Sequence, residues 1–112
     1  MRLFHLVEPA EWSAASAVGV YRPASLSAEG FVHFSFADQV SGTANLLYRD
    51  RAQLVVVEIE SDLVDAELRI EDSSSSGTEF PHVYGPIPTA AMVALHPLHR
   101  DASGDWEFTP PR

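Results

Sequence analysis

The stretch Leu54-Val55-Val56-Val57-Glu58-Ile59 decides the fold, because it is the most apolar run of the chain and is dominated by β-branched residues. Such a run is typical of a central strand that is buried on both faces of its sheet. Glu58 interrupts this run, and a carboxylate buried there requires a partner. Arg69, on a neighbouring predicted strand, is the candidate partner.

Two helices are predicted before this strand. The first begins at Pro9 and ends before Gly19, since proline is tolerated at the first helical position and glycine favours a C-terminal stop. Its apolar stripe consists of Trp12, Ala15 and Val18. The second helix begins at Ser35-Phe36-Ala37-Asp38, which resembles a capping box with Ser35 as the N-cap, and it runs to about Tyr48.

Short strands make up most of the remaining chain. They are predicted at Arg2–Val7, Phe31–Ser35, Glu67–Glu71 and Phe80–Tyr84, and as a final hairpin of Met92–Leu98 with Trp106–Phe108. Ser73–Gly77 is predicted to be a flexible surface loop. Helices come early and strands come late, so the fold class is α+β, with two helices packed on short antiparallel or mixed sheets. The 112 residues fit a single domain, 1–112.

Composition restricts the function classes. The absence of cysteine excludes thiol catalysis and disulfides, and the absence of lysine excludes Schiff-base chemistry. A net charge of −9 repels phosphate backbones, so we expect no nucleic-acid partner. The first apolar run is broken by His5 and Glu8 too early for a signal peptide, and no later run reaches membrane-spanning length. We therefore expect a cytoplasmic protein without a membrane partner.

Three histidines lie at inward-looking positions of predicted strands, namely His5, His33 and His82. Ser35 and Tyr84 follow the second and third of these by two residues, and in a strand such pairs share one face about 6.5–7 Å apart. Each pair can present two hydrogen-bonding groups to one ligand. Neutral histidine offers one donor and one acceptor, which suits sugar hydroxyls and amides.

Each of these residues also has a purely structural interpretation. A single histidine on a strand is typical of a hydrogen-bonded core residue, Ser35 can serve only as the helix cap, and Tyr84 can simply pack on Phe80. Three histidines and a water can hold zinc, but the sequence lacks a helical His-x-x-x-His pair, so we predict no metal site. His96 and His99 are predicted to be surface residues.

Glu71 is the candidate catalytic residue. It closes a short strand directly before the serine loop, and functional side chains are frequent at such positions. The alternative is an ordinary surface carboxylate at the end of a strand.

Several blocks of the sequence resemble the bacterial and plant family called domain of unknown function 952. They include Phe4-His5-Leu6-Val7, Glu29-Gly30-Phe31-Val32-His33-x-Ser35 and Phe80-Pro81-His82-Val83-Tyr84-Gly85-Pro86, and the resemblance spans residue 3 to about residue 98. This resemblance implies that His5, His33, Ser35, His82 and Tyr84 line one ligand-binding cleft.

A more distant resemblance concerns residues 31–64, which are similar to the core of RNA 2′-phosphotransferases of the ADP-ribosyltransferase fold. It implies a split-sheet architecture around a nicotinamide cleft, with NAD as the cofactor and with matches at His5, His33 and Ser35. Extending it, we place Tyr84 against the nicotinamide ring and Glu71 at the ribose. This chain is about half as long, lacks the arginine-rich N-terminal module and is acidic, which argues against a transfer-RNA substrate.

Three functions are compatible with the sequence. The first is a binding module whose polar cleft holds a small nucleotide-like or polar metabolite. The second is an NAD-dependent ADP-ribosyltransferase-like or glycohydrolase-like enzyme, and the third is a protein-interaction role. The sequence determines neither the ligand nor the oligomeric state.

Overall fold

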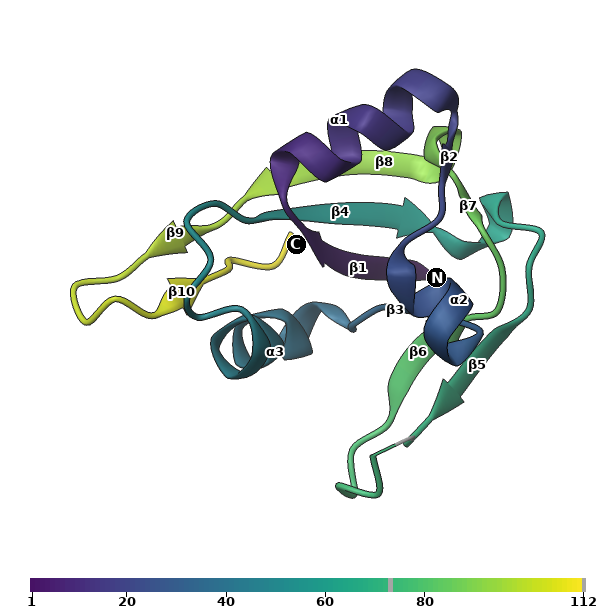
Figure 1. Ribbon diagram of the computed structural model, residues 1–112. Coiled ribbons are helices and arrows are strands. Elements are labelled where there is room, and N and C mark those ends of the chain that lie inside the picture. The colour runs from purple at the N-terminus through teal and green to yellow at the C-terminus, as the bar shows by residue number, and fades with distance from the viewer. Residues whose placement is uncertain (73, 112) are drawn as a thin grey trace.

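A three-stranded antiparallel sheet forms the centre of the protein (Figure 1). The computed structural model describes residues 1–72 and 74–111. In this sheet β4 (Val55–Glu60) lies between β1 (Arg2–Val7) and β8 (Met92–Pro97). Val56 and Val57 point to opposite faces of β4, and neither is exposed to solvent. The predicted central strand, buried on both faces, is confirmed.

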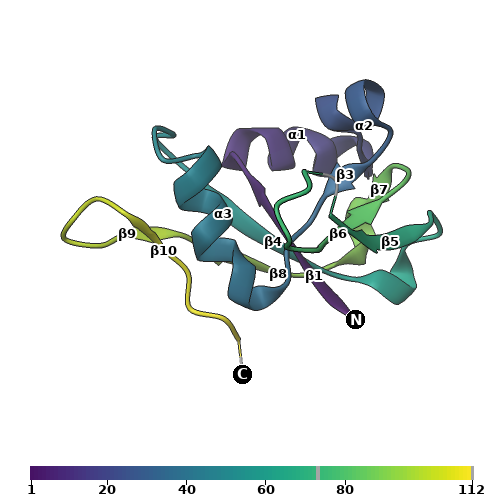
Figure 2. The same cartoon turned by 90° about the horizontal axis from the view of Figure 1, so that it is seen from below.

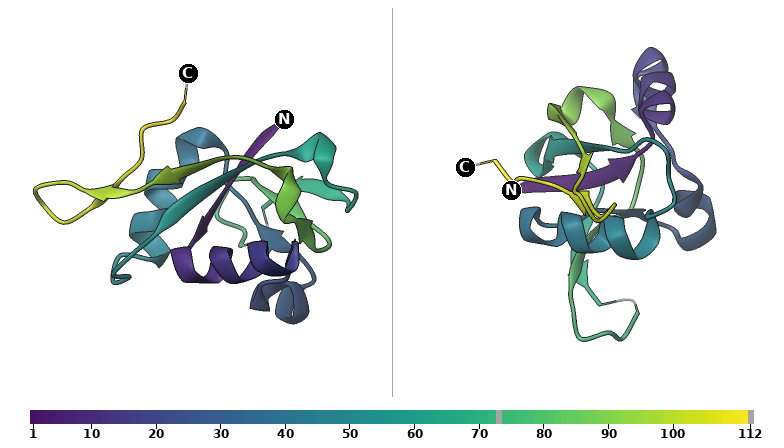
Figure 3. Two further views of the ribbon diagram at one scale, coloured as in Figure 1. Left: turned by 90° about the horizontal axis from the view of Figure 1, so that it is seen from above. Right: turned by 90° about the vertical axis from the view of Figure 1, so that its left-hand side faces the viewer.

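One long helix covers each face of this sheet, as Figures 1 and 3 show. On one face α1 (Pro9–Val18) buries Trp12 in a cluster with Leu3 and Val57, and α3 (Val40–Leu47) packs on the other face. Val18 is 77% exposed, so its predicted place in the apolar stripe of α1 is wrong. A residue six positions after Trp12 is rotated by about 120° from it around the helix and no longer faces the sheet.

A second three-stranded sheet contains two of the predicted histidines. Its order is β3 (Val32–His33), β6 (Phe80–Val83) and β5 (Leu68–Glu71), and its pairings are antiparallel. The two sheets meet where Phe4 of β1 and Ser35 exchange backbone hydrogen bonds of 2.9 and 2.7 Å. This bridge brings β1 next to the segment that follows β3.

The remaining elements are short. They are α2 (Ala24–Glu29), the pair β2 (Val20–Tyr21) and β7 (Ile87–Pro88), the pair β9 (His99–Arg100) and β10 (Trp106–Glu107), and the 3₁₀ turns η1 (Ala37–Gln39), η2 (Ser61–Leu63) and η3 (Thr89–Ala91). The β9–β10 hairpin extends away from the rest of the chain (Figure 2). The α+β class with few helices and small antiparallel sheets is confirmed, although α2 adds a third α-helix to the two that were predicted.

The predicted C-terminal hairpin is wrong in its pairing. Met92–Pro97 pairs with β4, and only His99–Arg100 pairs with Trp106–Glu107. The long apolar strand instead completes the central sheet as its edge strand beside β4.

The predicted capping box is displaced by one residue. The backbone N–H of Phe36 donates to Gln39 Oε1 over 2.9 Å, so Phe36 and not Ser35 precedes the turn that leads into α3. Ser35 differs because the bridge to β1 holds its backbone in an extended conformation.

The predicted Glu58–Arg69 pair is also wrong. Glu58 is paired with Arg2 at 3.0 Å and with His96 at 2.7 Å, whereas Arg69 of β5 donates to Glu67, the residue just before that strand. His96 is therefore a partner of a buried carboxylate, with a side chain only 24% exposed, and His99 is an exposed residue as predicted.

The predicted serine loop is only partly described, because Ser73 lies outside the described residues. The Asp72 carboxylate accepts hydrogen bonds from the backbone N–H groups of Ser76 and Gly77, at 3.0 and 2.6 Å.

Within residues 1–72 and 74–111, no helix combines the length and the apolar character that crossing a bilayer requires.

Candidate functional site

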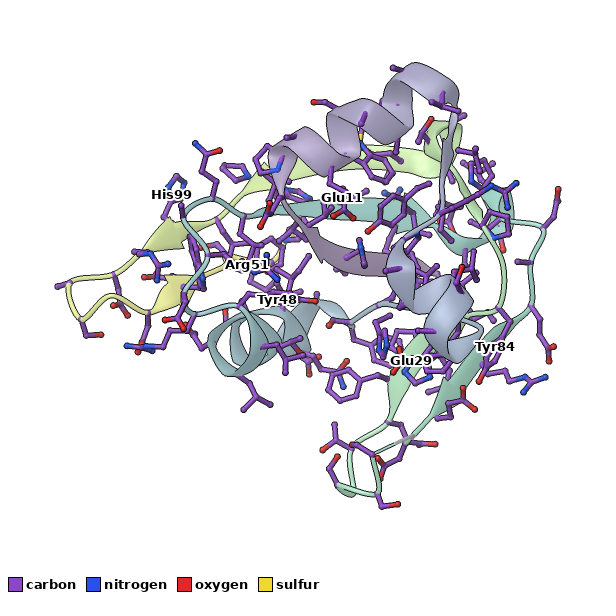
Figure 4. All side chains as sticks on the ribbon, viewed as in Figure 1. Glu11, Glu29, Tyr48, Arg51, Tyr84 and His99 are labelled. Carbon is purple, nitrogen blue, oxygen red and sulfur yellow. The ribbon has the colours of Figure 1, made fainter. Side chains whose placement is uncertain are left out.

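A cavity of about 550 Å³ lies where the two sheets meet. Its wall includes His5 of β1, His33 of β3, Ser35 and His82 of β6, and a further part of the wall comes from the C-terminal end of α3. Figure 4 shows the side chains, with Tyr48, another lining residue, labelled beside α3. Four of the five residues predicted to bind a ligand thus border the same space.

His5 is buried, and both of its ring nitrogens are engaged. Nδ1 lies 2.6 Å from the backbone oxygen of His33, and Nε2 lies 2.6 Å from the Tyr21 hydroxyl. Burial lowers the pKa of His5 to about 4, so the imidazole is neutral at physiological pH. Because a carbonyl can only accept, Nδ1 carries the proton and Nε2 is the acceptor. His5 therefore fixes the backbone of His33 at the cavity.

The Tyr21 hydroxyl connects His5 to an acid. It lies 3.0 Å from Glu11 Oε2 as well as 2.6 Å from His5 Nε2, and burial raises its pKa above the ordinary value. A hydroxyl has one proton, so Tyr21 can donate to only one of these two acceptors at a time. Glu11 and the cavity-lining His5 therefore compete for the one proton of the Tyr21 hydroxyl.

His82 is held from behind by Glu71. Its Nδ1 lies 2.9 Å from Glu71 Oε1, and the Tyr84 hydroxyl donates to the same oxygen. These hydrogen bonds, that from Tyr84 above all, lower the pKa of Glu71, which keeps it an ionised acceptor. The His82 proton therefore lies on Nδ1 and, in the neutral ring, the lone pair lies on Nε2. Phe31 stacks on this ring with the centroids 4.1 Å apart.

His33 and Ser35 complete the polar part of the wall. His33 Nε2 is hydrogen-bonded to Glu29, and its ring lies edge-on to that of His82 with the centroids 5.2 Å apart. Ser35 is 4% exposed. Its hydroxyl has no hydrogen-bond partner among residues 1–72 and 74–111, which leaves it available to a ligand.

Glu71 and Tyr84 do not line the cavity themselves. Glu71 contacts His82 directly, Tyr84 reaches it only through Glu71, and Figure 4 shows Tyr84 at the second sheet. The guanidinium of Arg69 lies 4.3 Å from the centre of the Tyr84 ring. The structure therefore groups the six predicted residues into four that border the cavity and two that support one of these four.

Several residues of the site were not predicted from the sequence. Tyr21 and Glu11 reach His5 only through the fold, and nothing in the sequence indicates this. Glu29 had a local signal, since it precedes His33 by four residues and the intervening Gly30 turns the chain with φ of 88°. Leu46 and Leu47, which line the cavity at the end of α3, were not among the predicted site residues.

The geometry gives no support to the three-histidine zinc alternative. Both His5 nitrogens and one nitrogen each of His33 and His82 already have partners. In the described part of the chain, no three histidine or acidic side chains are grouped as metal ligands would be.

Residues 6–95 match the model of a family described as "Protein of unknown function (DUF952)". The chain belongs to the DUF952 family. The DUF952 chain is also similar to the protein CC0527 from Caulobacter crescentus. Against its crystal structure the identity is 31% and the TM-score 0.83, with 96% of this chain and 94% of that chain covered. Against the solution structure of CC0527 the identity is 30% and the TM-score 0.73, with 93% and 90% covered.

No curated protein sequence matches the DUF952 chain. The likeness to CC0527 extends over almost the whole of both chains, so the two share one fold. The resemblance to ADP-ribosyltransferases gains no support from these matches.

Proposed function

We propose that this DUF952 protein binds a small polar metabolite in the cavity bordered by His5, His33, Ser35 and His82. The observation that carries the proposal is the convergence of these four side chains, from three strands and the segment that follows β3, on one space of about 550 Å³. That volume lies within the range of about 300–1,000 Å³ that is typical of small-molecule sites.

The hydrogen-bonding capacity of the wall supports a polar ligand. His82 Nε2 is an acceptor for a ligand O–H or N–H, because Glu71 holds the proton on Nδ1. The Ser35 hydroxyl can both donate and accept. His5 contributes indirectly, since its two nitrogens are already occupied and it holds the His33 carbonyl in place.

An enzyme of the NAD-dependent ADP-ribosyltransferase-like or glycohydrolase-like kind is the second candidate. The observation that favours it is the Glu71–His82 pair, since a carboxylate that orients a histidine is a common general-base arrangement. In this alternative His82 would take a proton from the attacking group. Glu71 could contact a ribose directly only by giving up its bonds to His82 and Tyr84.

A screen of uncharged and charged metabolites at millimolar concentration tests the proposal, with amide chemical shifts of the ¹⁵N-labelled protein as the readout. We expect at least one compound to shift the signals of Ser35, Leu47 and Ser76, which line the cavity. Ser35→Ala should weaken the binding of that compound. It should leave the melting temperature unchanged, because the serine hydroxyl has no hydrogen-bond partner among residues 1–72 and 74–111. His99→Ala is the matched control, since His99 is exposed on the distant hairpin.

The outcomes separate the candidates. A folded protein that binds no compound, or hits that are unaffected by Ser35→Ala, would refute the proposed function. Incubation with NAD, followed by chromatography for free nicotinamide, identifies the enzyme, whereas binding without product favours the binding module. If nothing binds and light scattering reveals an oligomer, the protein-interaction role is favoured, and the exposed Leu46 and Leu47 are its first candidates.

A further inference from the structure

The described residues that line the cavity include no arginine and no acidic residue. The chain has no lysine either, and its seven basic residues are all arginines. Proteins ordinarily bind phosphate and carboxylate groups through arginine or lysine, whose charge offsets the loss of hydration. The wall offers no such permanent charge to an anionic ligand.

Two carboxylates stand directly behind the wall. Glu29 is hydrogen-bonded to His33, and Glu71 is hydrogen-bonded to His82. If either histidine were to carry a positive charge, the negative charge of its partner carboxylate would balance it. The neutral His5 adds none. Together with the net charge of −9, this arrangement makes the potential in the cavity unfavourable for an anion.

Part of the wall is apolar and exposed to solvent. Leu46 and Leu47, at the end of α3, are 81% and 63% exposed, and both border the cavity together with Phe80. Exposed leucines beside a polar surface can bury apolar area against a ligand, which is a favourable contribution. A ligand that fills the space therefore meets both hydrogen-bonding groups and hydrocarbon.

We propose that the cavity takes an uncharged ligand with an aromatic or aliphatic body and a hydroxyl or amide group at one end, and that it rejects anionic analogues of the same shape. This inference rests on the proposed ligand-binding function and narrows it. The amide or hydroxyl proton is donated to His82 Nε2, Ser35 bonds the polar end, and the body lies against Leu46 and Leu47. Nucleotides with phosphate groups fall outside this class.

Pairs of probes that differ only in charge test the inference, with the same amide shifts as the readout. The pairs are benzamide with benzoate, and adenosine with its 5′-monophosphate. We expect each neutral member to bind in the millimolar range and each anion to bind at least about tenfold more weakly. Added salt should narrow that difference, since it screens the repulsion.

A variant that is expected to gain anion binding provides a second test, which does not rely on detecting weak binding of an anion to the natural protein. Leu46→Arg places a cation at the cavity mouth, and the exposure of Leu46 makes the change compatible with folding. It should tighten binding of benzoate and of the nucleotide by about tenfold relative to their neutral partners. Leu63→Arg is the matched control, because Leu63 is also exposed but does not line the cavity.

The inference is overturned if both anions bind the natural protein as tightly as their neutral partners, or if neither neutral probe binds. An anionic hit from the metabolite screen that shifts the Ser35 signal would also overturn it, while leaving the proposed ligand-binding function intact. A screen in which no compound binds would refute both the proposed ligand-binding function and this inference about the charge of the ligand.

Discussion

Protonation of His5 should control the stability of this protein between neutral and mildly acidic pH. The ring is buried and neutral, with a pKa of about 4, whereas a histidine in the unfolded chain has a pKa of about 6.5. Well above pH 6.5 His5 is neutral in both states, and the stabilisation is fully present. As the pH falls from about 6.5 to 4, the unfolded state binds a proton that the folded state does not, so stability is lost.

The size of this loss follows from the two pKa values. Between about pH 7 and pH 5, proton linkage at His5 lowers the free energy of unfolding by about 2 kcal/mol. Carboxyl groups whose pKa is lowered, such as Glu60 and Asp72, destabilise the protein only below about pH 4.5, where they begin to bind protons in the unfolded chain. The interval above pH 5 therefore reports mainly on histidines.

Urea unfolding at several pH values measures the effect. Wild-type protein should lose about 2 kcal/mol more than His5→Gln over this interval, because glutamine keeps a hydrogen-bonding amide but does not titrate. His99→Gln, at an exposed position, should follow the wild type. NMR titration of the His5 ring gives the folded pKa directly.

Two results would refute this reasoning. One is an equal pH dependence in wild type and His5→Gln. The other is a His5 ring that titrates near 6.5 or above, which would mean that the chain through Tyr21 to Glu11 stabilises the imidazolium more than burial destabilises it.

Three further changes test other parts of the structure. His96→Ala should lower the free energy of unfolding by about 2 kcal/mol in urea titrations, since it removes a hydrogen bond to the buried Glu58 carboxylate; an unchanged midpoint would contradict this. Gly85→Ala should cost about 1–3 kcal/mol, because its new Cβ would lie 2.6 Å from that of Ala66, and adding Ala66→Gly should recover most of the loss. Glu11→Gln should leave stability at neutral pH equal or higher, since its amide can donate to the Tyr21 oxygen and free the hydroxyl proton for the histidine; a clear loss in urea would contradict the proton count.

The sequence predicted the local elements whose signals are strong. The run around Val56 and Val57 gave the central strand because β-branched side chains on both faces leave no solvated face. Pro9 and Gly19 marked the limits of α1, since each restricts or frees the backbone at one end of a helix. The α+β class followed from the order of these elements.

Local patterns failed where a distant strand determined the outcome. Ser35 has a side chain suited to capping, but the bridge to Phe4 holds its backbone extended. Glu58 needed a partner, as its burial implied, but strand register selects that partner. Register places His96 of β8 beside it and leaves Arg69 in the other sheet.

For the candidate site, too, the sequence indicated some of the residues but not the contacts between them. Sequence reasoning identified His5, His33, Ser35 and His82, because histidine and serine at strand positions are few and chemically distinctive. It could not assign their functions within the site. Glu71 lies on β5 and Tyr84 directly follows β6, and only the pairing of these two strands lets Glu71 bond both His82 and Tyr84 outside the lining of the cavity.

What the sequence determined by itself is thus the central strand, the limits of α1 and the residue types that gather at the site, since these depend on backbone preferences and local alternation. The tertiary structure alone decided that two sheets meet at Phe4 and Ser35 and that Tyr21 reaches His5. It also decided that no arginine borders the cavity among the described residues. Those features depend on contacts between segments far apart in the chain, which no local pattern encodes.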